Sequence, residues 1–213
     1  DAGNYTLTLP TDLTVDATVI LTPSTIVFAD GAAVSKEYGS GAYTNAVSGD
    51  GAGAITYSSG TEATATVDAS GEVTIVGVGT TVITAVKAAT ATHATVTNTY
   101  TLTVTAKELT VTGLTAVYNP GATAGSGTVT INGKPTLVGV VGGDDVSVSG
   151  TATGSITGAT ATEAVTVTGL TLTGAKAGNY TLALPTGLTV DATVVLTPST
   201  IVFADGAAVS KEY

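Results

Sequence analysis

Few side chains in this sequence could carry out chemistry. The 213 residues include no cysteine, methionine or tryptophan and a single histidine, His93. A serine nucleophile needs a histidine base within reach, and a metal cluster needs several strong ligands. His93 lies in the threonine-rich segment Ala91-Thr92-His93-Ala94, without a second histidine or a nearby acidic residue. We therefore assign it a packing or solvent role and predict that the chain is not an enzyme and binds no cofactor.

One acidic pair is a candidate for binding calcium. Asp144 and Asp145 follow two glycines, and their carboxylates are suitable calcium ligands. Calcium takes about 6 to 8 oxygen ligands, however, and the sequence has no dense D-x-D-x-D-G loop. An ordinary solvated turn is therefore the simpler interpretation of Asp144 and Asp145.

Two covalent modifications are also compatible with the sequence. Lys107, Glu163 and Asn179 fall in the first, middle and last strand regions of one predicted domain, an order that an intramolecular isopeptide bond could use. The alternative to this bond is that Lys107 is a charged residue at the rim of the domain and that Asn179 shapes the turn before Tyr180. Asn4 and Asn179 each begin an Asn-Tyr-Thr sequon, so both are candidate glycan acceptors.

The charge balance and the hydropathy of the chain exclude nucleic acid and membrane insertion, respectively. Six lysines stand against 16 acidic residues, which gives a net charge of -10 and a pI near 4.1. Such a chain repels phosphate backbones, so we expect no nucleic-acid partner. The mean hydropathy is +0.44, but no uninterrupted apolar run approaches the roughly 18 to 20 residues of a spanning helix. We therefore expect no membrane insertion in this segment.

Alternation of apolar residues with threonine predicts strands along the whole chain. The sequence contains 46 threonines, and Tyr100, Leu102 and Val104 alternate with three of them. This period of two is typical of strands that have one face in a core and one in solvent. Turn signals separate the strands, for example Asp30-Gly31, Asp50-Gly51, Asn132-Gly133 and Asp205-Gly206. The pattern predicts an all-β chain of tandem antiparallel β-sandwich (immunoglobulin-like) domains.

An internal repeat fixes the domain organisation that we expect. Residues 1–38 return as residues 176–213 with only four differences, an offset of 175 residues. This period is far longer than the 20 to 50 residues of a solenoid unit, so each copy should hold whole domains. Two sandwiches fit one period, and we expect the segment to be one link of a longer repeat array.

The first whole domain is predicted at residues 19–106. It contains the opening Leu21-Thr22-Pro23-Ser24, the run from Ala65 to Thr74, and Gly77-Val78-Gly79-Thr80 with the strand that follows. In these stretches it resembles the bacterial immunoglobulin-like domains of the second group, found in intimin- and invasin-type surface proteins. We expect residues 68–71 to turn a hairpin, and Tyr57 to fill the core where many members carry tryptophan. Sheet interior is expected from Val73, Ile75, Val82 and Ala85.

The second domain is predicted at residues 107–193. Its characteristic stretches are Leu109–Tyr118, Leu137–Val146, Val165–Leu172 and Ala177–Leu182. In these stretches it resembles the YDG repeat domain of large secreted adhesins of the filamentous-haemagglutinin type. The family's Tyr-Asp-Gly-Thr reads Tyr118-Asn119-Pro120-Gly121 here, which removes any role of that aspartate. Residues 1–18 then correspond to the last strand of a preceding YDG-like domain, and residues 194–213 to the start of the next immunoglobulin-like domain.

The junctions between these domains indicate the function. From Thr101 to Val111 the chain runs without a glycine, serine or proline spacer, whereas flexible linkers need such residues. We therefore predict a structural repeat of a very large extracellular bacterial surface or secreted protein, a stiff adhesin stalk or the body of a filament. We expect its partners to be neighbouring repeats of the same chain. Lateral or end-to-end self-association into fibres is an alternative to a monomeric stalk. The alternative is a ligand-binding adhesin module that contacts glycans, a host receptor or neighbouring chains.

Overall fold

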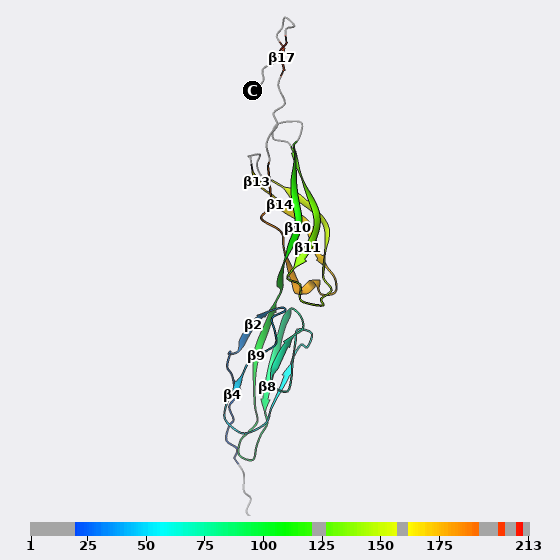
Figure 1. Ribbon diagram of the computed structural model, residues 1–213. Coiled ribbons are helices and arrows are strands. Elements are labelled where there is room, and N and C mark those ends of the chain that lie inside the picture. Colours follow the sequence, from blue (N-terminus) through cyan, green and yellow to red (C-terminus); the bar gives the residue numbers. More distant parts are fainter. Residues whose placement is uncertain (1–19, 121–126, 157–161, 192–199, 203–207, 211–213) are drawn as a thin grey trace, which may run out of the picture.

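The computed structural model describes residues 20–120, 127–156, 162–191, 200–202 and 208–210. These residues form strands and one short 3-10 helix, η2 (Ala177–Asn179), so the predicted all-β class is confirmed. Figure 1 shows two elongated β domains arranged end to end. No helix among the described residues is long and apolar enough to cross a membrane.

The first domain contains two main sheets and a short strand pair. The four-stranded sheet has the order β2-β9-β8-β5, the three-stranded sheet has the order β3-β7-β6, and β1 pairs with β4. Their bounds are β1 (Val27–Phe28), β2 (Ala33–Glu37), β3 (Tyr43–Thr44), β4 (Val47–Ser48), β5 (Ile55–Ser59), β6 (Ala65–Val67), β7 (Glu72–Ile75), β8 (Gly79–Lys87) and β9 (Val96–Thr105).

The core of this domain follows the predicted alternation along β9. Tyr100, Leu102 and Val104 are buried, and the threonines between them are exposed. The ring of Phe28 packs edge-on against Tyr100, with ring centroids 4.7 Å apart. Such an aromatic pair buries a large apolar area, so it anchors the short β1–β4 pair on the four-stranded sheet. Tyr57 is half-buried and packs at the side of this core.

The predicted hairpin and most of the predicted interior are present. The Asp68 carboxylate accepts hydrogen bonds from the backbone N–H groups of Ser70 and Glu72, both at 2.9 Å, which closes the turn between β6 and β7. Val73 and Ala85 are fully buried, as expected. The prediction for Val82 was wrong, because that side chain is 42% exposed.

The reason for the error at Val82 is strand parity. Side chains of a strand alternate between its two faces, so residues 82 and 85 cannot both point inward. On β8 the inward face carries Thr81, Ile83, Ala85 and Lys87. Ile83 takes the core position that we expected for Val82.

The second domain contains a five-stranded sheet with the order β14-β12-β11-β10-β15, beside a short β13-β16 pair. Val111, Leu114, Val165, Val167, Leu170 and Val190 form a buried cluster inside it. The strand bounds are β10 (Lys107–Pro120), β11 (Gly127–Val138), β12 (Ser147–Ser155), β13 (Glu163–Ala164), β14 (Thr166–Thr173), β15 (Tyr180–Ala183) and β16 (Thr189–Val190). In the segment predicted to begin another domain, β17 (Thr200–Val202) pairs with β18 (Ala208–Ser210).

Two strand pairs depart from the antiparallel arrangement that we predicted. β2 runs parallel to β9, and β10 runs parallel to β15. The other ladders between described strands are antiparallel. In each domain the parallel partners lie far apart in sequence, because they come from the early and late parts of the domain.

The second domain contains, at two places, a glycine on one strand that faces a glycine on the partner strand. The sequence Thr-Val-Thr-Gly-Leu-Thr occurs at residues 110–115 on β10 and again at 166–171 on β14. In both copies the glycine has positive φ, at Gly113 and Gly169, and faces a positive-φ glycine of the partner strand. A Cβ on Gly133 would collide with the Gly113 carbonyl, and one on Gly150 with the Gly169 carbonyl. The ladder is irregular at both places, as expected where a bulge bends paired strands.

The two domains are joined by a single residue between strands. β9 ends at Thr105 and β10 begins at Lys107, so only Ala106 separates them. Figure 1 shows the two strands following each other along the long axis of the molecule. The junction without a spacer, which the sequence predicted, is therefore present in the structure.

Candidate functional site at the domain junction

Three local structures bring polar side chains to the junction. Tyr38 directly follows β2, and its backbone N–H donates to the Thr105 carbonyl at 2.9 Å. Asp144 closes a turn in the loop between β11 and β12, where its N–H donates to the Val141 carbonyl at 3.1 Å. Tyr180 follows η2 and begins β15. The first domain thus supplies one tyrosine, and the second supplies the aspartate and the other tyrosine.

These three side chains form what we call the tyrosine–aspartate cluster (Tyr38, Asp144 and Tyr180). The Tyr38 hydroxyl donates to Asp144 Oδ2 at 2.9 Å, and the Tyr180 hydroxyl donates to the same oxygen. The two rings meet edge to face with centroids 5.4 Å apart. The Tyr180 oxygen also accepts a hydrogen bond from the Val141 N–H at 3.1 Å. Hydrogen bonds to a charged carboxylate are stronger than neutral ones, so the cluster links the two domains firmly.

The electrostatics of the cluster keep both tyrosines neutral. Burial raises the pKa of Tyr180 to about 12, and its hydrogen bond to Asp144 adds to the rise. Burial also raises the pKa of Tyr38, again with a contribution from Asp144. At neutral pH both hydroxyls therefore remain protonated and can donate to the carboxylate.

Apolar packing continues across the same junction. One cluster of buried residues includes Leu102 and Val104 from the first domain and Leu109 and Tyr180 from the second. Val141 packs against it, and a Cβ on Gly39 would collide with the Val141 side chain. Because the cores are continuous, a change in the angle between the domains would expose apolar surface.

Two further polar contacts cross the junction. Asn179 Oδ1 accepts a hydrogen bond from the Val78 backbone N–H at 3.0 Å. Lys107 Nζ lies 3.2 Å from Glu37 Oε1. The ion pair is solvent-exposed, so it contributes about 0 to 1 kcal/mol, less than the buried contacts.

The three isopeptide candidates are placed at different parts of the second domain. Lys107 and Asn179 lie at the junction, where their side chains contact Glu37 and Val78. Glu163 lies on β13, where it pairs with Val190 of β16. The isopeptide bond stays a prediction, and an intact mass lower by one ammonia would establish it.

The calcium candidates have protein partners. Asp144 Oδ2 accepts from the two tyrosines, and Asp145 Oδ2 accepts from the Ala175 N–H at 3.1 Å. Within the ranges that the structure describes, no group of three or more His, Cys, Asp or Glu side chains could hold a metal ion. The turn at Asp144 and Asp145 therefore has a clear structural use, which is to join η2 and the first domain to the loop.

The remaining candidate residues divide between described and undescribed parts of the chain. Asn4 lies outside the described residues. Asn179 is half-buried at the junction, and glycosylation there stays a prediction. His93 is half-buried, and its Nδ1 lies 2.9 Å from the Thr92 hydroxyl.

Sequence reasoning missed the tyrosine–aspartate cluster, although the sequence holds a signal for it. Tyr5 and Tyr180 occupy equivalent positions of the repeat, and so do Tyr38 and Tyr213. Both tyrosines of the cluster thus recur with the period of 175 residues. Tyr38 and Asp144 are 106 residues apart, so no local pattern could show that they meet.

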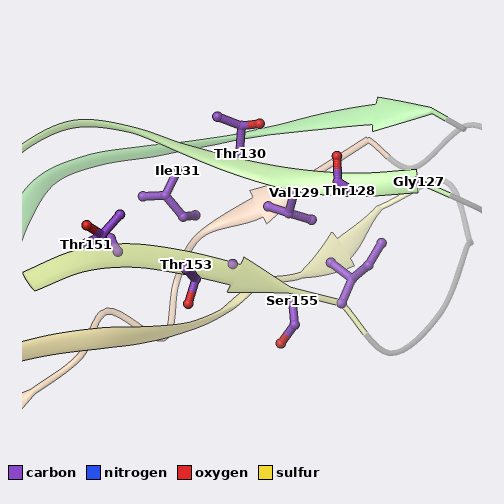
Figure 2. Close-up of a pocket in the computed structure, with 11 residues that line it drawn as sticks. Gly127, Thr128, Val129, Thr130, Ile131, Thr151, Thr153 and Ser155 are labelled. Atoms are coloured by element: carbon purple, nitrogen blue, oxygen red, sulfur yellow. The ribbon is translucent and has the colours of Figure 1, made fainter.

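A separate groove opens between β11 and β12, away from the junction. Its volume is about 600 Å³, and the two strands pair at only one position beside it, Val129 with Gly154. Figure 2 shows threonine hydroxyls and aliphatic side chains along the groove. No titratable side chain is among the residues that line it. The lining is Gly127, Thr128, Val129, Thr130, Ile131, Thr151, Ala152, Thr153, Gly154, Ser155 and Ile156.

Comparison with known families matches each domain separately. Residues 39–90 match the intimin, immunoglobulin-like domain, and residues 105–187 match the YDG domain. None of the curated proteins compared with the chain matches it. Both resemblances drawn from the sequence are thereby confirmed, while the outer domain boundaries stay predictions.

Proposed function

Because the chain joins an intimin-type immunoglobulin-like domain to a YDG domain, we propose that it is a stiff spacer of an extracellular bacterial surface protein. In this role repeated domain pairs form an adhesin stalk or the body of a filament, and each pair adds length. The observation that carries the proposal is the junction, where one residue, a shared core and the tyrosine–aspartate cluster join the domains.

The junction supports this role because a spacer must resist bending. A flexible linker would let the domains reorient and would shorten the average distance between the ends of an array. Here a bend must separate the Tyr38 hydroxyl from Asp144 and uncover the packing around Val141. Both changes have a free-energy cost, so the extended arrangement is favoured.

The repeat supports the same role. Since both tyrosines of the cluster recur with the 175-residue period, a longer array can form the same junction in each copy. Near-identical copies suit a spacer, which needs one unit many times, better than a binding tip, which needs it once.

A pair of spin labels tests the proposal directly. The chain has no cysteine, so Thr99→Cys on β9 and Thr171→Cys on β14 give one exposed label in each domain. For a stiff spacer we expect a narrow distance distribution by pulsed electron resonance. A control pair on opposite sheets of the first domain, Thr66→Cys on β6 and Thr99→Cys on β9, gives the width that the labels alone produce. A distribution across the junction several times broader than this control would contradict the proposal.

The second predicted role, binding of a glycan or another chain, draws on the groove between β11 and β12. Its hydroxyl-bearing rim could make hydrogen bonds to a sugar, and its aliphatic floor could contact the sugar's apolar face. Binding of the whole chain to a glycan array, reduced by Thr153→Lys within the groove, would favour this role.

A further inference from the structure

We infer that the two parallel strand pairs, β2 with β9 and β10 with β15, make this chain resistant to tension along its length. The inference deepens the proposed function, since a spacer between a surface and a target carries tension. It concerns a different property, however, because a chain can be stiff against bending and still unfold when it is pulled.

The first part of the argument is the position of the paired strands. In the first domain, five consecutive pairs join β2 to β9, from Ala33 with Thr101 to Glu37 with Thr105. In the second domain, four pairs join β10 to β15, from Lys107 with Tyr180 to Thr110 with Ala183. Each pair thus connects an early strand of its domain to a late one.

The second part is the direction of the load. Tension pulls the beginning of β2 toward one end of the molecule and the end of β9 toward the other. Because the strands are parallel and side by side, this load acts along their axes and stretches all the inter-strand hydrogen bonds together. In an antiparallel hairpin pulled at its two open ends, the bonds would break one after another. Shear of a parallel pair therefore requires a larger force than unzipping.

Backbone hydrogen bonds also join β2 and β9 at both ends of their paired segment. The Thr101 N–H donates to the Ala32 carbonyl, and the Tyr38 N–H donates to the Thr105 carbonyl, both at 2.9 Å. In a parallel ladder alternate residues of a strand bond to the same neighbour. The N–H groups of Val34 and Lys36 therefore face β9, whereas the N–H of Ser35 faces the open edge of the sheet.

The two pairs are connected in series at the junction. β9 continues through Ala106 into β10, so tension passes from one pair to the next along the backbone. The tyrosine–aspartate cluster lies across the same point, since Tyr38 follows β2 and Tyr180 begins β15. Tension pulls these two strands apart, and the hydroxyl bonds to Asp144 oppose that movement.

Single-molecule force spectroscopy on the whole chain tests the inference through the pulling geometry. In the first arrangement handles are attached at the two termini, which loads β2 and β9 in shear. In the second, one handle is moved to Ala42→Cys, an exposed position after β2, while the other stays at the C-terminus. This arrangement pulls the Glu37 and Thr105 ends of the same pair apart, so the bonds open one by one.

We expect the first domain to unfold at a clearly lower force in the second arrangement. The event is recognised by its shorter released length, because the residues before the handle are no longer stretched. Equal unfolding forces in the two arrangements would overturn the inference. Failure here leaves the spin-label result unaffected, so stiffness and resistance to tension are judged separately.

A proline pair provides a second measurement at one strand. Lys36→Pro removes an N–H that faces β9, and Ser35→Pro removes the neighbouring N–H that faces the open edge, where proline is tolerated. Lys36→Ala controls for the loss of the lysine side chain, which lies over the Tyr43 ring. With terminal handles we expect a lower unfolding force for Lys36→Pro than for the other two variants. The same force for all three would contradict the role of the pair.

Discussion

Removing one hydroxyl from the tyrosine–aspartate cluster should loosen the junction without disturbing either domain. Tyr38→Phe keeps the aromatic ring, which packs edge to face on Tyr180, and deletes the hydroxyl, which donates to Asp144 at 2.9 Å and also interacts with the Asn179 side chain. Tyr43→Phe is a matched control, because the Tyr43 hydroxyl is 3.1 Å from that of Tyr100 inside the first domain.

The size of the effect follows from the type of hydrogen bond. A bond to a charged acceptor contributes about 1.5 to 3 kcal/mol. Asp144 is half-buried, so solvent screens part of this, and the lower end, about 1.5 kcal/mol, applies. Asp144→Ala should cost more, about 2 to 6 kcal/mol, because two buried hydroxyls lose their acceptor at about 1 to 3 kcal/mol each.

Hydrogen exchange at one amide reports directly on the junction. The Val78 N–H belongs to the first domain and its acceptor, Asn179 Oδ1, belongs to the second. A loss of about 1.5 kcal/mol corresponds to about tenfold faster exchange when opening of the junction limits exchange. We expect this acceleration in Tyr38→Phe, whereas the Thr101 N–H inside the first domain should keep its rate.

A double-mutant cycle then separates the contact from indirect effects. If Tyr38 acts through Asp144, Tyr38→Phe adds little in the Asp144→Ala background. Unchanged exchange at Val78 in Tyr38→Phe, or an equal acceleration in Tyr43→Phe, would refute the reasoning.

Three further predictions concern pH and glycine. The pKa of Tyr180 is about 12 in the folded protein against 10.0 ordinarily, so its contribution to the free energy of unfolding is complete below pH 10 and lost as the pH rises through 12. Urea denaturation should show this fall, and Tyr180→Phe should reduce it. Gly39→Ala adds a Cβ against Val141 at a positive φ, so exchange at the junction should accelerate. Gly133→Ala should destabilise the second domain by about 1 to 3 kcal/mol, measured by thermal unfolding, whereas Gly142→Ala meets nothing within 4 Å and should be close to neutral.

Local sequence patterns predicted the local structure well. Alternation with threonine identified β9 and its inward residues, because burial of one sheet face imposes a period of two. The turn at residues 68–71 was predictable because an aspartate and a glycine supply its hydrogen bonds and its positive φ. The prediction for Val82 was wrong because Val82 and Ile83 are both apolar, so the sequence does not show which of the two points into the core.

Long-range pairing could not be predicted in the same way. Nothing in the composition of β2 distinguishes a parallel partner more than 60 residues away from an antiparallel neighbour. The same holds for the junction, where Asp144 lies in a glycine-rich loop that looks like an ordinary solvated turn. Its role depends on the shape of two folded domains, which places both tyrosines beside it.

The single residue Ala106 between β9 and β10 also constrains how many residues can separate the two domains. Inward-facing residues are even-numbered on β9, as at Leu102 and Val104, and odd-numbered at the start of β10, before its irregularity at Gly113, as at Leu109 and Val111. One inserted or deleted residue would reverse which way every β10 side chain points relative to β9. The second domain would then rotate by roughly half a turn about the long axis, and Asp144 would face away from Tyr38. The count of residues across this joint therefore has to stay fixed in any copy of the array that forms the same junction.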